Sequence, residues 1–154
     1  MTVNDALADR TITISREISA PLSSVWKAWT EPEHLIKWWG PDGFTNTFHA
    51  IEVREGGHWV FTMHGPDGED YPNRIVFTEI LPMQRIAFVH DSGEGDPHPF
   101  QSEISFIEAD GKVTVTLTNI LDSKEERDRV VEEVGAIEGG KQTLGRLAAY
   151  VESM

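Results

Sequence analysis

The sequence predicts an α+β protein in which one curved antiparallel sheet wraps around a long C-terminal helix. Three observations lead to this fold class. Residues 11–19 alternate between apolar and polar side chains, six further segments between residues 44 and 119 have the pattern of strands joined by turns, and residues 136–152 carry an apolar stripe at helical spacing. Two short helices are expected between the first strand and the other six.

The first predicted strand has an apolar face made of Ile12, Ile14 and Ile18, which Arg16 interrupts. Its opposite face carries threonine, serine and glutamate side chains, so we expect a half-buried strand. The preceding residues 1–10 are polar and are expected to form a flexible arm, whereas residues 11–154 are expected to form a single domain.

The next stretch, Ala20 to Pro41, holds four of the five tryptophans. Pro21 is expected to be the first residue of one helix, whose face places tryptophans 26 and 29 together. Thr30 and Glu33 have capping-box spacing and predict the start of a second helix, which carries Trp38 and Trp39. These indoles either close a core or line the mouth of a cavity.

Six strands are predicted over residues 44–53, 58–64, 73–80, 84–90, 100–108 and 112–119, with glycine- or proline-containing turns between most of them. Residues 91–97 are expected to form a loop. Ser123 and Glu126 have the spacing of another capping box, and Glu125 and Arg129 the spacing of an ion pair.

The last predicted helix, residues 136–152, has its apolar stripe at Ile137, Gly140, Leu144, Leu147, Ala148 and Val151. Glycine in a helix interior costs roughly 1 kcal/mol relative to alanine. The glycines at 135, 139, 140 and 145 therefore predict either a kink or a close approach of this helix to another element.

Composition restricts the function. The 154 residues include no cysteine, which excludes disulfides, thiolate metal ligands and cysteine nucleophiles. The net charge of −13 disfavours nucleic acid and anionic membranes as partners. No signal peptide or membrane-spanning segment is expected, which favours a cytoplasmic protein. The histidines lack ligand spacing, so no metal or other cofactor is expected.

Four motifs carry a resemblance to a known family: VWKAWTEPEHLIKWWGP, GGHWVFTMHGPDG, EILP and EGGKQTLGRLAAYVE. With them the chain after Arg10 resembles the START-like helix-grip (SRPBCC) superfamily, in the branch named for the C-terminal domain of the heat-shock-protein-90 ATPase activator. The resemblance implies a helix-grip fold with a hydrophobic cavity between the sheet and the last helix. It also implies a ligand-binding or chaperone-linked role in the stress response.

Two positions depart from the family pattern. Many relatives have a tryptophan after the glycine that begins the last helix, where this chain has Gly139-Gly140. Many end the fifth strand with threonine-tryptophan, where this chain has Val89-His90. Both differences are expected to change the volume or polarity of the cavity, and Gly140 is expected to leave space in it.

Glu52 and His90 are the polar residues expected to orient a ligand. A turn of four residues at 54–57 places Glu52 opposite Trp59, and a turn of two places it opposite Phe61; both registers predict the inner face. A carboxylate there would be desolvated, or paired with Arg16 or Arg74. His90 shares a strand face with Phe88. His58 and His64 share a face that is expected to be the outer one.

The expected ligand site is an apolar cavity, reached past Trp38 or Trp39 and the loop at residues 91–97. The residues expected to form it are Trp38, Trp39, Glu52, Trp59, Phe61, Met63, Phe77, Phe88, His90, Phe106, Gly140 and Leu144.

Three functions are compatible with this sequence. The leading hypothesis is a non-enzymatic domain, monomeric or homodimeric, that binds a small apolar or amphipathic molecule. The alternatives are an enzyme of the cyclase/dehydratase kind, with Glu52 or His90 as acid or base, and a protein-interaction module that contacts a chaperone. An enzyme should have two or more convergent polar groups inside the cavity, and an interaction module a filled cavity and an exposed apolar patch.

Overall fold

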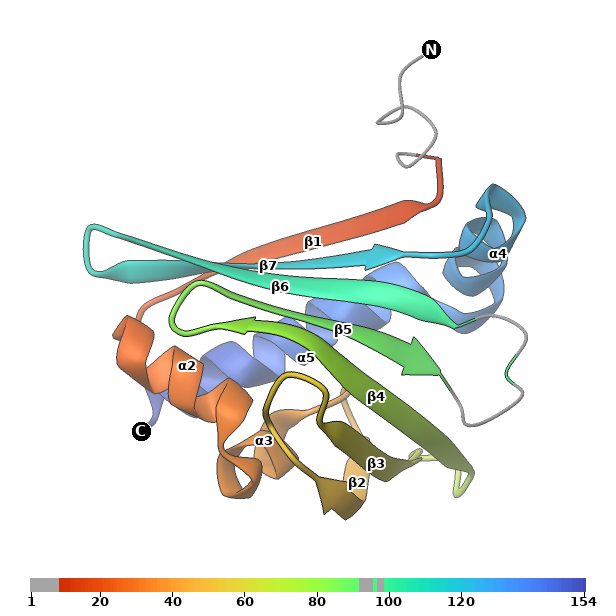
Figure 1. Ribbon diagram of the computed structural model, residues 1–154, viewed down its shortest axis with the longest axis horizontal. Coiled ribbons are helices and arrows are strands. Elements are labelled where there is room, and N and C mark those ends of the chain that lie inside the picture. Colours follow the sequence, from red (N-terminus) through yellow and green to blue (C-terminus); the bar gives the residue numbers. More distant parts are fainter. Residues whose placement is uncertain (1–8, 92–95, 97–98) are drawn as a thin grey trace.

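The computed structural model describes residues 9–91, 96 and 99–154, so most of the expected N-terminal arm and of the loop at 91–97 lies outside it. Seven antiparallel strands form one sheet in the order β1-β7-β6-β5-β4-β3-β2 (Figure 1). The strands are β1 (Thr11–Ile18), β2 (Thr45–Ile51), β3 (His58–His64), β4 (Asp70–Leu81), β5 (Arg85–Asp91), β6 (Phe100–Ala109) and β7 (Lys112–Ile120). The predicted α+β fold class is confirmed.

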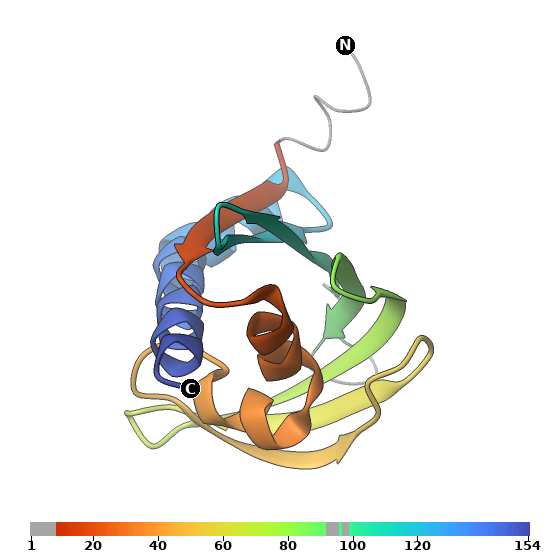
Figure 2. The same cartoon turned by 90° about the vertical axis from the view of Figure 1, so that its left-hand side faces the viewer.

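The helices are α2 (Leu22–Thr30), α3 (Pro32–Trp38), α4 (Lys124–Arg129), the π-helical turn η1 (Val130–Val134) and α5 (Ala136–Glu152). Figure 2 looks along the curved sheet and shows α5 spanning the opening between β1 and the β2 side. The shorter α2 and α3 lie within the concave side of the sheet. This arrangement is the helix-grip fold that the sequence predicts.

The core lies between the concave face of the sheet and the helices, because alternate strand residues point to that face. Paired residues such as Trp59 and Ile75, or Ile104 and Leu117, stand side by side on it. From α5 the predicted stripe contributes Leu144, Leu147, Ala148 and Val151, all buried. Arg16, which interrupts the apolar face of β1, remains exposed.

The helix α5 begins after Gly135, whose φ of 71° is left-handed and therefore suits glycine. Further along the helix, a Cβ atom at Gly140 would lie 2.3 Å from Cδ1 of Ile14 in β1. A contact that short is sterically forbidden without movement of Ile14. Of the two explanations for the glycines, close approach to another element therefore holds at Gly140.

The predicted capping box at Thr30 and Glu33 is wrong. Thr30 is the last residue of α2, and its hydroxyl donates to the carbonyl of Trp26 at 2.8 Å. The helix α3 begins at Pro32, because proline suits the first helical position, and Glu31 is its N-cap. Pro21 likewise precedes α2 as its N-cap and is not the first helical residue.

At α4 the predicted N-cap is confirmed, since Ser123 Oγ accepts a hydrogen bond from the Glu126 amide at 3.0 Å. The predicted pair of Arg129 with Glu125 is wrong. Arg129 forms its ion pair with Glu126, whose side chain is buried, one residue closer along the helix. A buried carboxylate requires a charged partner more strongly than an exposed one does.

The strand β4 begins at Asp70, three residues before the predicted start, and therefore includes Pro72. Pro72 pairs with Thr62 of β3, and among the described residues the pairing of β4 with β5 begins at Arg74.

The buried stripe of α5 gives a test of the fold. Leu147→Asp would place a carboxylate in the core and should unfold the protein or lower its stability by at least about 4 kcal/mol. Ala149→Asp is the matched control, because Ala149 is exposed on the same helix. Thermal and urea denaturation measure both variants; equal stability of Leu147→Asp and wild type would contradict the packing described.

Candidate functional site

A pocket of about 220 Å³ opens between the N-terminal half of α5 and one end of the sheet's concave face. Its walls come from the loop after α3, from strands β3, β5, β6 and β7, and from the start of α5. The lining residues are Trp39, Gly40, Pro41, Met63, Phe88, His90, Phe100, Ser102, Leu117, Asn119, Gly135, Ala136, Gly139, Gly140 and Thr143. Most of them are apolar, and none is charged if His90 is neutral.

Five of the twelve residues predicted for the site lie together in this pocket: Trp39, Met63, Phe88, His90 and Gly140. Six others are buried in the core away from it: Trp38, Trp59, Phe61, Phe77, Phe106 and Leu144. Two explanations were open for the tryptophans. Core packing holds for Trp38, whereas Trp39 both packs in the core and lines the pocket.

The aromatic side chains that were expected to line the cavity instead pack against one another and fill the concave side of the sheet. Trp59 stacks on Phe61 with ring centroids 4.4 Å apart, and Trp39 packs against Trp59 at 5.0 Å. Phe106 is covered by Trp26 of α2 at 5.4 Å. Because α2 and α3 occupy the middle of the concave face, the open space is displaced toward the start of α5.

The expected inner position of Glu52 is wrong. Its side chain is 60% exposed and forms an ion pair with Arg54, Nε to Oε2 3.1 Å. The cause is a β-bulge at His49, which shifts the pairing so that Ile51, and not residue 50, stands opposite Trp59. One inserted residue reverses the direction of every later side chain on the strand.

The expectation that Gly140 leaves space is also wrong in detail. The missing side chain of Gly140 is replaced by Ile14, which fills the position where Cβ would lie. Gly139 has more room, because a Cβ there would meet only Cγ of Pro41 at an ordinary 3.6 Å. The free space beside α5 therefore lies at Gly139 rather than at Gly140.

His90 is held in one tautomer inside the pocket. Its Nε2 lies 2.7 Å from Oδ1 of Asn73, and the Asn73 amide nitrogen is committed to the carbonyl of Tyr71. Oδ1 must therefore accept, and His90 Nε2 carries the proton. Burial lowers the pKa of His90 to about 4, against the opposing effect of Asp91 and Asp96. At neutral pH the ring is uncharged, and Nδ1 has no hydrogen-bond partner among the described residues.

Three polar residues of the pocket were missed by the sequence interpretation: Ser102, Asn119 and Thr143. Ser102 is buried, and its hydroxyl donates to Oδ1 of Asn119 at 2.7 Å. The sequence did contain a sign of them. Residues 102 and 119 are in phase with the apolar residues of their strands, so their side chains point to the concave face. The Asn119 amide nitrogen has no hydrogen-bond acceptor among the described residues.

Arg146 of α5 fixes the loop that forms one side of the pocket. Its Nη1 donates to the carbonyls of Gly40 at 2.9 Å and Pro41 at 2.8 Å. Burial lowers the pKa of Arg146, while Asp42 opposes this. These two bonds join α5 to the α3–β2 loop at the wall of the pocket.

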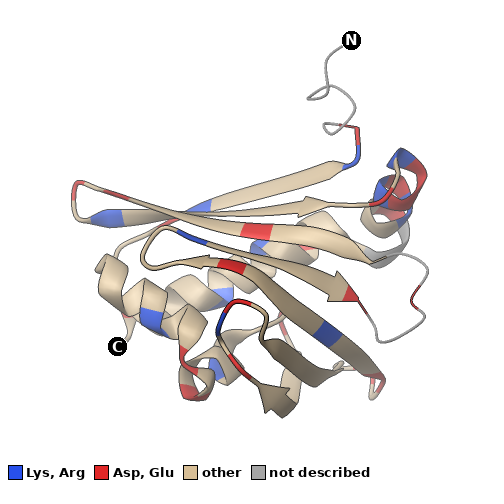
Figure 3. Ribbon diagram, viewed as in Figure 1, with Lys and Arg blue, Asp and Glu red and all other residues tan. Residues whose placement is uncertain are grey.

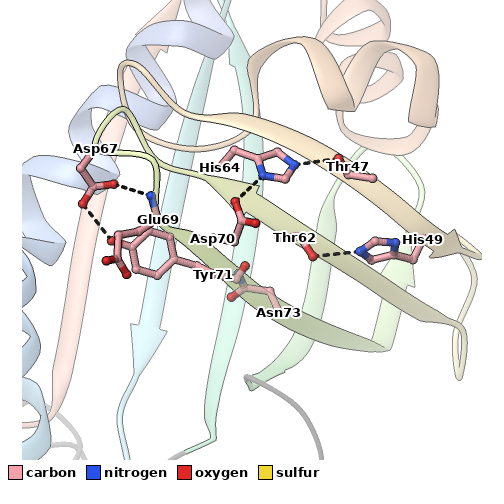
Figure 4. A network of polar contacts seen from close by, with 9 residues as sticks. All are labelled: Thr47, His49, Thr62, His64, Asp67, Glu69, Asp70, Tyr71 and Asn73. Atoms are coloured by element: carbon pink, nitrogen blue, oxygen red, sulfur yellow. Dashed lines mark hydrogen bonds and ion pairs between the residues drawn. The ribbon is translucent and has the colours of Figure 1, made fainter.

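A second group of polar residues spans β2, β3 and β4 (Figure 4), and of its members Asn73 is the one that bonds to His90 of the pocket. His64 Nε2 is 2.7 Å from the hydroxyl of Thr47, and its Nδ1 is 2.7 Å from Oδ1 of Asp70. This hydroxyl–imidazole–carboxylate order resembles that of a hydrolase. All three side chains are exposed on strands, His64 by 37% and Asp70 by 66%, so the network is assigned to cross-strand pairing. The predicted outer position of His64 is confirmed.

One group of potential metal ligands occurs in the described part of the chain. Glu31, Glu33 and His34 bring ligand atoms within 4.8 Å of one another at the start of α3. His34 Nδ1 already lies 2.6 Å from the hydroxyl of Tyr150, and Glu33 is exposed. Nothing else in the structure indicates an ion there, so no function is assigned to the group.

Fold and pocket together define a START-like helix-grip protein. The model of one family, the Activator of Hsp90 ATPase homolog 1-like proteins, matches residues 19–152. The chain therefore belongs to this family. No curated protein matches the chain. Among the described residues, no helix has the length and apolar character needed to cross a membrane.

Solved structures share this fold. A protein of Nitrosomonas europaea has a TM-score of 0.85 and 23% identity, with 95% of this chain and 96% of that chain covered. One from Mycobacterium smegmatis has a TM-score of 0.83 and 27% identity, covering 96% and 94%. One from Arthrobacter aurescens has a TM-score of 0.86 and 23% identity, covering 96% and 89%.

The environment of His90 predicts a pH dependence of stability. The unfolded chain binds a proton at His90 below about pH 6.5, but the folded protein does so only near pH 4, where its lowered pKa lies. Stability should therefore fall by up to about 3 kcal/mol as the pH drops from 6.5 to 4.

Urea denaturation across this pH range measures the effect. His90→Gln should flatten the slope relative to wild type, whereas His58→Gln should leave it unchanged because His58 is exposed. An identical pH profile for wild type and His90→Gln would show that His90 does not titrate abnormally.

Proposed function

We propose that this protein binds a small, neutral, mostly apolar molecule in the pocket between the sheet and the start of α5. The observation that carries the proposal is an apolar pocket containing polar groups with unused hydrogen-bonding capacity. Such a combination is the usual form of a small-molecule site. The pocket is about 220 Å³, below the roughly 300–1,000 Å³ of sites for drug-sized ligands, so a small ligand is favoured.

The unused polar groups indicate what the ligand carries. His90 Nδ1 is an acceptor, so it favours a hydroxyl or amine donor on the ligand. The Asn119 amide nitrogen is a donor, so it favours a carbonyl or ether oxygen. Neither residue is charged at neutral pH, and no lysine or arginine lines the pocket among the described residues. A carboxylate would lose its hydration there without gaining a cation, which disfavours anionic ligands.

An enzymatic role has weaker support. Several polar groups line the pocket, as expected for an enzyme, but Ser102 donates to Asn119 and not to His90. A nucleophile and its base should be within hydrogen-bond reach of each other. Glu52, the other acid–base candidate, lies on the outer surface. The arrangement therefore supports binding more than proton transfer.

A chaperone contact, which the family name suggests, also has weaker support. The exposed large apolar side chains of the described residues are distributed over β4, the turn after it, β6 and the C-terminus: Tyr71, Leu81, Met83, Ile107 and Met154. An interaction module is expected to gather such side chains into one patch.

The absence of cysteine is compatible with the cytoplasmic location that we propose.

Calorimetric titration with two related probes tests the binding proposal. 2-Naphthol, which has a hydroxyl donor and no charge, should bind with an affinity on the order of micromolar to tens of micromolar. 2-Naphthoate has a similar ring and a carboxylate, and should bind at least about tenfold more weakly because no cation lines the pocket. Equal affinity for both, or no binding of either, would contradict the proposal.

Filling the pocket supplies the structural control. Gly139→Trp should abolish binding, because Gly139 lines the pocket and its Cβ position is free. Glu138→Trp adds the same ring at the adjacent exposed position and should bind like wild type. Gly140→Trp would collide with Ile14 and would report on folding instead. Equal binding by Gly139→Trp and wild type would place the probe elsewhere.

A further inference from the structure

A second concave surface lies on the other side of the sheet edge and shares no residue with the pocket. It is a groove of about 430 Å³ between β1 and α5. Its lining residues are Thr11, Ile12, Thr13, Ile14, Ser15, Arg16, Arg127, Ile137, Lys141 and Leu144. We call it the β1 groove. The binding function proposed above does not use it.

The groove runs along the free edge of β1. Six consecutive residues of the strand, Thr11 to Arg16, contribute to its wall. Alternate side chains of a strand point to opposite faces, so a surface touched by consecutive residues must follow the backbone edge. The sheet order places β1 at one end beside β7, and within the part of the chain that the structure describes no strand pairs with its other edge.

The hydrogen-bond register shows which backbone groups face the groove. The amide of Leu121 donates to the carbonyl of Arg10, which makes these two residues a hydrogen-bonded pair across β1 and β7. Pairs alternate along an antiparallel ladder, so Ile12 and Ile14 also face β7 with their N–H and C=O groups. The backbone N–H and C=O groups of Thr13 and Ser15 therefore point to the free edge of β1.

The groove is also a cationic site on an anionic protein. The chain has 13 basic and 26 acidic residues, yet Arg16, Arg127 and Lys141 all line this surface and, among the described residues, no acidic one does. Figure 3 shows basic positions on β1, α4 and α5. The acidic neighbour Glu17 is engaged with Lys112, Oε1 to Nζ 3.3 Å. A negatively charged partner would therefore be attracted here selectively.

Arg127 has hydrogen-bonding capacity to spare. Its Nε is buried and has no acceptor among the described residues. Its Nη1 forms an ion pair with Oδ1 of Asp128 at 3.4 Å, which leaves Nε without an acceptor. Burial of an unpaired guanidinium N–H costs free energy that an incoming acceptor would recover.

We propose that the β1 groove binds an extended acidic peptide segment, which adds to the sheet as a strand beside β1. The outward N–H and C=O groups of Thr13 and Ser15 would pair with the peptide backbone, and the three cations would contact its carboxylates. The apolar floor at Ile137 and Leu144 suits small apolar side chains at alternate peptide positions. A second copy of this chain is disfavoured, because Arg16 of each copy would approach the cations of the other.

Fluorescence anisotropy with a labelled peptide tests the proposal. The probe is a peptide of about eight residues that alternates valine and glutamate, which spans the roughly 20 Å of six strand residues. It should bind wild-type protein, and more weakly as salt is raised. The same peptide with alternate backbone nitrogens methylated cannot pair as a strand, and should lose at least about tenfold in affinity.

Variants of the protein separate backbone pairing from charge. Thr13→Pro removes one outward N–H without touching the ladder to β7, and should weaken binding, whereas Thr13→Ala should not. Arg16→Glu should weaken it by at least about tenfold. Lys37→Glu, at an exposed position on α3, is the charge-matched control and should bind like wild type. Thermal denaturation establishes that each variant is folded.

Several results would overturn the proposal. Equal binding of the methylated peptide, or of the peptide by Thr13→Pro, would reduce the interaction to charge alone. Equal binding of a valine–lysine peptide would remove the charge argument. A dimer in analytical ultracentrifugation that Thr13→Pro dissociates would assign the edge to a second copy instead. Loss of 2-naphthol binding would leave this proposal unaffected, because the two sites share no residue.

Discussion

The packing around Trp39 is the interaction on which the rest of the structure depends. Its ring contacts Trp29 and Trp38 on the helical side at 5.8 Å and Trp59 on the sheet side at 5.0 Å. Its backbone carbonyl accepts a hydrogen bond from the side-chain amide of Asn46, with Nδ2 at 2.8 Å. Large aromatic side chains bury about 150–250 Å² each, so this junction holds a substantial part of the core. It joins α2 and α3 to β3, and the packing of Trp26 on Phe106 joins α2 to β6 beside it.

This junction also decides where open space remains. A curved sheet closed by one helix would enclose a long cavity, but the tryptophans and phenylalanines fill its middle. The pocket survives only at the end where β5, β6 and β7 bring polar residues onto the concave face. That polarity is internally arranged: Asn73 orients His90, and Ser102 orients Asn119. His90 Nδ1 and the side-chain amide nitrogen of Asn119 have no hydrogen-bond partner among the described residues, whereas the opposite ring nitrogen and the amide oxygen are committed.

The sequence predicts the strands and the last helix well, because the two-residue period of strands and the helical spacing of apolar residues can both be recognised in one sequence. It does not predict the bulge at His49, since nothing in the local pattern marks an inserted residue, and this one residue moves Glu52 to the outside. It assigns the pocket's Met63, Phe88 and His90 from strand alternation. It does not separate them from Phe77 or Phe106, because that distinction depends on where α2 and α3 pack.

The two surfaces differ in charge for a reason that lies in α5. At Gly140 the helix backbone approaches β1 closely enough for Ile14 to occupy the position of a side chain, which separates the space on its two sides. Toward the sheet's concave face the helix presents Gly139 and Thr143, and the pocket is uncharged. Toward the edge of β1 it presents Lys141, beside Arg16 and Arg127. One helix thus lies between an apolar pocket and a groove lined by three cations, and the two surfaces share no residue.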